Sequence, residues 1–238
     1  MKICVLGLDC AAPEIVFGDE RLVNLRRLMD AGMYGRLESV VPPITVPAWM
    51  CMSTSQDPGS LGVYGFRNRT DYSYDKLGFA NSASIKALAI WDQLAREGKK
   101  SIIIGVPPNY PPRRINGISI GCFLTPDTVK NDFTYPASIK AKLNELVGEY
   151  PVDVKNFRTD RKDWLKEEIF RMSEKQWKVV RWLKAEGDQV DASMGIRGKV
   201  LDGIGEDATV ADVRLDIVER VDAGDEEADL FDRSLHAA

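Results

Sequence analysis

The chain has 238 residues, 44% of them hydrophobic, and carries a formal net charge of −4 at pH 7. This composition supports a sizeable core and excludes a disordered chain, and an acidic balance without a basic, aromatic-studded stripe excludes a nucleic-acid partner. No apolar run is long enough to cross a membrane and the start lacks the pattern of a signal peptide, so we expect a cytoplasmic protein with no membrane partner.

The first 110 residues alternate between apolar, strand-like segments and amphipathic helical ones, the pattern of a parallel sheet with crossover helices. Predicted strands are residues 2–8, 34–40 and 100–106, and predicted helices are residues 21–29, 46–53 and 85–96. Thr45 is the candidate N-cap of the helix over 46–53, and Pro47 lies in its first turn. The fold class that follows is α/β, with a mostly parallel sheet sandwiched by helices.

From Tyr135 on, the pattern turns helical and then changes in character. Residues 137–147 and 162–184 predict two helices. Residues 191–238 hold 13 Asp and Glu against 5 Lys and Arg, which makes this end strongly acidic. We therefore expect one α/β domain over residues 1–187, followed by an acidic tail over 188–238 that is poorly ordered or unrelated, in preference to a small acidic subdomain.

Two residues of the N-terminal region could carry chemistry. Asp9 follows the first predicted strand, at the edge where α/β folds place their sites, and is either a metal ligand or the cap of the next turn. Thr45 lies where a helix begins, and the N–H groups and helix dipole there favour an anion such as a phosphoryl oxygen. Its hydroxyl is a nucleophile only when a base or a metal ion stabilises the alkoxide; the alternative is a plain N-cap.

A family resemblance rests on three pieces of the sequence: Asp9 with its strand, the segment Pro42 to Trp49 (PPITVPAW), and the segment Ser53 to Phe66. Together they resemble the alkaline phosphatase superfamily, and within it the type I phosphodiesterase/nucleotide pyrophosphatase group with its phosphohydrolase and phosphomutase relatives. The resemblance implies that Asp9 binds a divalent metal ion, Zn or Mn, and that Thr45 binds the same ion and is the nucleophile. It also implies that the substrate is a phosphate-ester small molecule.

The sequence departs from the family pattern after the nucleophile segment. Leu61 and Gly62 stand where the family has His-Gly, and Phe66 stands where a phosphate-binding Asn is common. Asn68, two residues later, and its neighbour Arg67 are then the candidate contacts to phosphoryl oxygens. Solvated loop residues are the alternative.

The largest departure concerns the remaining metal ligands of the family. They include several His and lie C-terminal to the position that corresponds to residue 185. This chain has one His, and Asp232 and His236 match the Asp-x-x-x-His spacing of a single ligand pair, with coincidence as the alternative. A complete two-metal site cannot be assembled from these residues, so we expect incomplete metal binding and a C-terminally truncated chain. An incomplete sheet would expose an unpaired edge and favour self-association.

Two functions therefore remain open for the chain. One is a metal-dependent phosphohydrolase of the phosphodiesterase/nucleotide pyrophosphatase type that acts through Thr45. The other is a catalytically inactive remnant or pseudoenzyme that binds at most a phosphate ester or a protein. A sulfatase is disfavoured, because the residues after Thr45 lack the Arg of the sulfatase C/S-x-P-x-R motif.

Overall fold

The computed structural model describes residues 3–186 and 192–196. Its helices and strands are, in chain order, β1 Ile3–Gly7, α1 Pro13–Gly18, α2 Val23–Ala31, α3 Thr45–Thr54, α4 Pro58–Leu61, β2 Arg67–Arg69, β3 Leu77–Phe79, the 3-10 helix Ser82–Ser84, α5 Ile90–Arg96, β4 Ser101–Ile104, β5 Gly117–Ile120, β6 Thr134–Tyr135, α6 Ser138–Val147, α7 Lys162–Glu186 and β7 Ala192–Ile196. No helix in this part of the chain is both long and apolar enough to span a membrane.

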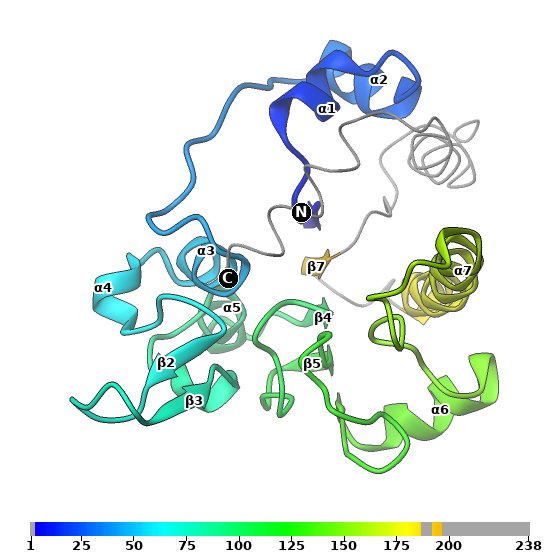
Figure 1. Ribbon diagram of the computed structural model, residues 1–238. Helices are drawn as coiled ribbons and strands as arrows, with labels where there is room; N and C mark the ends of the chain where they lie inside the picture. The colour runs from blue at the N-terminus through cyan, green and yellow to red at the C-terminus, as the bar shows by residue number, and fades with distance from the viewer. Residues whose placement is uncertain (1–2, 187–191, 197–238) are drawn as a thin grey trace.

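A five-stranded sheet with the order β1-β7-β4-β5-β6 forms the centre of the molecule (Figure 1). β1, β7, β4 and β5 run parallel, and the short β6 pairs antiparallel with β5. The predicted α/β class with a mostly parallel sheet is confirmed. β7 comes from the region expected to be a tail and joins β1 to the rest of the sheet, whereas the domain boundary at residue 187 stays a prediction.

Side chains that alternate across β4 form a core on each face of the sheet. On one face, Ile103 belongs to a buried cluster with Trp49 of α3 and Trp91 of α5. On the other face, Ile102 and Ile104 pack in a cluster with side chains of α6 and α7. Successive residues of a strand point to opposite faces, so an all-apolar strand such as β4 is covered on both sides. Figure 1 shows the resulting layers, with α3 and α5 on one side of the sheet and α6 and α7 on the other.

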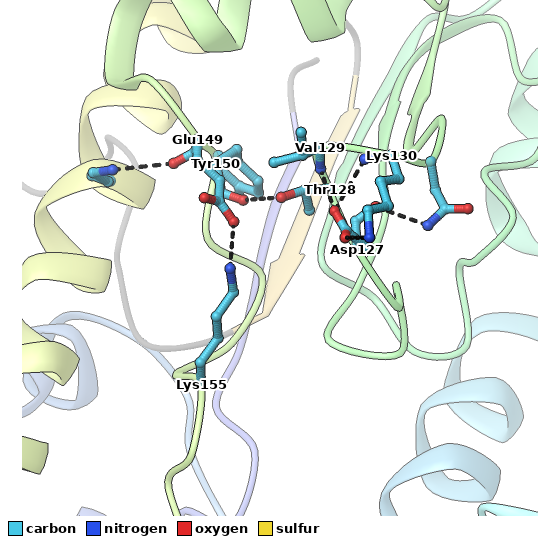
Figure 2. A network of polar contacts seen from close by, with 9 residues as sticks. Asp127, Thr128, Val129, Lys130, Glu149, Tyr150 and Lys155 are labelled. Carbon is cyan, nitrogen blue, oxygen red and sulfur yellow. Dashed lines mark hydrogen bonds and ion pairs between the residues drawn. The ribbon is translucent and has the colours of Figure 1, made fainter.

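A polar network ties the loop after β5 to the segment before α7 (Figure 2). The hydroxyl of Thr128 donates to the backbone oxygen of Tyr150 at 2.9 Å, and Lys155 pairs with Glu149 at 2.8 Å. Asp127 accepts hydrogen bonds from the two backbone amides of residues 129 and 130, which keeps the pKa of its carboxyl below the usual value. These groups bond to one another, which indicates a structural role for the network.

The strand predicted over residues 34–40 is wrong. Residues 33–40 form no helix or strand, and the side chain of Leu37 is 93% exposed. The ring of Tyr34 lies 5.6 Å from that of Phe17, and Arg36 pairs with Glu14 at 3.8 Å. The segment therefore contacts α1 instead of pairing in the sheet, where β7 is the neighbour of β1.

The helix predicted over residues 85–96 begins later than expected, at Ile90. The carboxylate of Asp92 accepts a hydrogen bond from the backbone amide of Ala89 at 2.9 Å. This contact satisfies one of the donors at the helix N-terminus and marks where the helix begins. The residues before it follow the 3-10 helix Ser82–Ser84, which carries a capping box of its own at Asn81.

Candidate active site at the end of strand β1

The candidate site begins where β1 ends. Asp9 lies in the turn after the strand, and Cys10 adopts a left-handed conformation with φ 58°, which turns the chain away toward α1. Thr45 is the first residue of α3, and its hydroxyl donates to Oδ2 of Asp9 at 3.4 Å. This separation is long for an O–H···O hydrogen bond, so the bond is weak. The fold nevertheless brings together two residues that are 36 positions apart.

Thr45 is not the N-cap predicted from the sequence. Ile44 holds that position with extended backbone angles, and no side chain caps the helix. The amide of Ala48 is the first to bond back into the helix, to the backbone oxygen of Ile44 at 3.0 Å. The amides of Thr45 and Val46 precede it and have no partner within the helix, and the third residue is Pro47. Val46 is fully buried, so the start of α3 offers a ligand the N–H group and the hydroxyl of Thr45, a combination suited to an anion.

Trp49 holds Asp9 from one turn further along α3. Its indole Nε1 donates to Oδ1 of Asp9 at 3.3 Å, and the side chain is 7% exposed. The ring lies directly over Gly7, where an added Cβ would collide with it. β1 and α3 can thus approach this closely only because residue 7 has no side chain. Sequence reasoning missed Trp49, although its spacing of four residues from Thr45 places both on one helix face.

The donors at this site fit two of the ligands of a divalent cation. Asp9 offers a carboxylate and Thr45 a hydroxyl, both hard oxygen donors. Two oxygen ligands on one tetrahedral ion, each about 2.1 Å from it, lie about 3.4 Å apart, which equals the separation of Thr45 Oγ1 and Asp9 Oδ2, 3.4 Å. Within the described residues no group of three His, Cys, Asp or Glu side chains could hold a metal ion. The site therefore supplies part of a ligand set.

The predicted phosphate contacts lie on β2, and their polar groups have other partners. Oδ1 of Asn68 accepts from the amide of Tyr64 at 2.8 Å, and its Nδ2 donates to the backbone oxygen of Gly65 at 3.0 Å. The guanidinium of Arg67 lies 5.0 Å from the centre of an aromatic ring of β3. A Cβ on Gly65 would be 3.7 Å from Cδ1 of Ile44, so this loop passes beside the start of α3. Asn68 holds that loop closed.

The other predicted metal ligands, Asp232 and His236, lie outside the described residues. Of the predicted site residues, the structure brings Asp9 and Thr45 into contact. The loop of Asn68 runs close to the same helix start.

Similar folds occur in two solved structures of phosphonoacetate hydrolase from Sinorhizobium meliloti 1021, in complex with phosphonoacetate and with phosphonoformate. Both have a TM-score of 0.55, with sequence identities of 14% and 15%. Each alignment covers 93% of this chain and 52% of the other, so this chain spans about half the length of the structures that it matches. The likeness shows an alkaline phosphatase-like fold.

Sequence comparison gives a second, independent finding. No curated protein sequence matches the chain. The family model "Type I phosphodiesterase / nucleotide pyrophosphatase" matches residues 3–223, which is most of the chain and includes both Asp9 and Thr45. The expected resemblance is therefore confirmed at the level of the family. The chain belongs to the type I phosphodiesterase/nucleotide pyrophosphatase family.

Proposed function

We propose that this chain carries the nucleophile half of a metal-dependent phosphohydrolase, with Thr45 as the nucleophile and Asp9 as a metal ligand. The observation that carries the proposal is the contact of the Thr45 hydroxyl with the Asp9 carboxylate at the start of α3. A hydroxyl placed between a carboxylate and the unbonded amide of a helix start is positioned to attack the phosphorus of a phosphoryl group bound there. Family membership supports phosphodiester or pyrophosphate hydrolysis as the reaction class.

The chain's own residues would act in two steps. A phosphoryl oxygen of the substrate binds at the amide of Thr45, which places phosphorus beside the Thr45 hydroxyl. The Thr45 oxygen forms a bond to phosphorus as the bond to the leaving oxygen breaks; Thr45 loses one proton and the leaving alcohol gains one. Water then breaks the bond between Thr45 and phosphorus, and the hydroxyl is restored. A Zn or Mn ion bound by Asp9 and Thr45 would lower the pKa of the hydroxyl and offset the charge on phosphorus.

The ligand that suits this site is a phosphate-ester small molecule. The two solved neighbours bind phosphonoacetate and phosphonoformate, which supports an anionic phosphorus compound as ligand here. Arg67 and Asn68 are secondary candidates for its contacts, and each would have to leave its present partner to reach it. Asp232 and His236 are proposed as one further pair of metal ligands, which leaves metal binding incomplete.

A second candidate function is ester binding without turnover. It is favoured by the single His in the whole chain, since two-metal phosphohydrolase sites need several further ligands. In this case the amide of Thr45 at the start of α3 would still bind a phosphoryl group. The two candidates differ in whether a folded chain with added metal consumes its substrate.

The test is hydrolysis of a chromogenic phosphodiester by the purified chain with added Zn²⁺ or Mn²⁺. Thr45→Ala should abolish turnover and leave the melting temperature almost unchanged, because the hydroxyl caps no backbone group. Thr70→Ala, at an exposed Thr on the β2–β3 hairpin, is the matched control and should retain full activity. Turnover that survives in Thr45→Ala would refute the proposal, and a folded wild-type chain without turnover would favour ester binding alone.

A further inference from the structure

Trp49 makes a contact that the proposed chemistry does not use. Its indole N–H donates to one oxygen of Asp9 at 3.3 Å, while Thr45 donates to the other at 3.4 Å. Both donors come from one face of α3, one turn apart. The carboxylate is therefore bonded at each oxygen by a different residue of the same helix. Such a carboxylate has one preferred rotation about its terminal bond, which an unbonded carboxylate lacks.

Packing fixes the position of the indole as well. Trp49 belongs to the buried cluster that contains Val46 and Ile103, and only 7% of it is exposed. Its ring occupies the space that a side chain on Gly7 would need. A ring held on these sides cannot swing away from Asp9 without leaving a void in a closely packed core. The N–H group therefore stays at one point beside the end of β1.

We propose that Trp49 is a positioning residue for Asp9: it holds Oδ1, so that Oδ2 is the oxygen turned toward Thr45 and offered to a divalent cation. The inference that a cation binds at Asp9 rests on the proposed function, whereas the orientation of the carboxylate does not. Removing a partner that orients a metal ligand typically weakens metal binding by about 10–100-fold. If Trp49 had a packing role alone, replacing it would lower the stability of the fold and leave the metal affinity of the folded protein unchanged.

Trp49→Phe is the variant that separates these roles, because it keeps an aromatic ring over Gly7 and removes the N–H donor. Trp91→Phe is a matched control from the same cluster. Trp91 is 4% exposed, and its indole nitrogen has no hydrogen-bond partner among the described residues. Both variants lose the same ring atoms, but only one loses a bond to Asp9. Trp49→Phe should therefore melt at a somewhat lower temperature than Trp91→Phe, because it also loses that bond, and metal binding is compared where both variants are folded.

The readout is binding of Zn²⁺ alone, followed through the backbone amide resonance of Asp9 in ¹H–¹⁵N spectra. We expect Trp49→Phe to weaken Zn²⁺ binding about tenfold or more relative to Trp91→Phe. A second measurement needs neither metal nor a folded Trp49 variant. In Asp9→Ala, the indole N–H resonance of Trp49 should shift, and that of Trp91 should not.

The outcomes separate this inference from the proposed function. Equal Zn²⁺ affinity in the two Trp variants, with wild-type binding that Asp9→Ala abolishes, would overturn the role of Trp49 and leave the proposed function standing. A chemical shift of the Trp49 indole N–H that is the same in Asp9→Ala and in wild type would also overturn that role. A wild-type chain whose Asp9 amide responds to no metal would overturn the proposed function, and with it the role of Trp49 in metal binding.

Discussion

Replacing Gly7 by Ala tests the contact on which the whole site depends. An added Cβ at residue 7 would collide with three atoms of the Trp49 ring, and the backbone of Gly7 needs no positive φ, so the effect is purely steric. Overpacking a core typically costs about 1–3 kcal/mol. Displacing the indole also weakens its hydrogen bond to Asp9, for about 1 kcal/mol more. We expect the free energy of unfolding to fall by about 2–4 kcal/mol in total.

The assay is urea denaturation of Gly7→Ala beside Gly35→Ala, with the slope of each transition checked against wild type. Gly35 has no atom within 4 Å of its ideal Cβ position and no positive φ, so its replacement should be close to neutral. In a thermal scan, the loss in Gly7→Ala corresponds to roughly 2–4 °C per kcal/mol for a chain of this size. Two variants of equal stability would refute the inferred contact between β1 and α3.

Three other predictions concern single side chains. Asn68→Ala should lower the free energy of unfolding by about 1–2 kcal/mol in urea, because two hydrogen bonds to backbone are lost; unchanged stability with a raised KM would instead indicate a phosphate contact. The amide and the hydroxyl of Ser60 hold the pKa of Asp57 below the usual 3.8. The ionised Asp57 carboxylate therefore stabilises the fold above pH 3.8, and this stabilisation is lost as the pH falls through the pKa of Asp57 in the folded protein. The difference between the urea midpoints of wild type and Asp57→Asn should therefore shrink below pH 3.8, and a constant difference would contradict the assignment. Burial raises the pKa of the Cys122 thiol to about 11. An aromatic disulfide reagent should therefore label the exposed Cys4 rapidly and Cys122 only when the protein unfolds. Equal labelling of the two cysteines in the folded protein, measured by mass spectrometry, would be inconsistent with this burial.

Much of the fold and part of the site follow from local sequence patterns. The apolar run of β1 ends at a turn that carries Asp9, and the Pro-flanked Thr45 marks the start of α3, so both residues could be placed at element ends without a structure. The family resemblance implies that both residues bind one metal ion, so their proximity could be anticipated from it, although no strand leads into Thr45. The 25-residue α7 was equally clear, because its apolar positions recur with helical spacing.

What the sequence could not supply depends on pairing between distant segments. Residues 34–40 have an acceptable strand pattern, but a strand needs a partner, and the neighbour of β1 comes from β7, nearly 190 positions later. The bond from Trp49 to Asp9 likewise depends on how closely α3 approaches β1, which Gly7 sets. The amide of Asn68 suits a phosphate contact by its chemistry, whereas its bonds to its own loop depend on how the chain folds around it.

The claim that Thr45 is the nucleophile is tested most directly by trapping the covalent intermediate. The chain is mixed with a phosphodiester and Mn²⁺ or Zn²⁺, quenched in acid, digested and measured by mass spectrometry. We expect the peptide that contains Thr45 to carry one phosphoryl group that still bears the second ester of the substrate, and the same peptide from Asp9→Ala to carry none. Substrate that is hydrolysed while Thr45 stays unmodified, at a rate that Thr45→Ala does not change, would contradict the account.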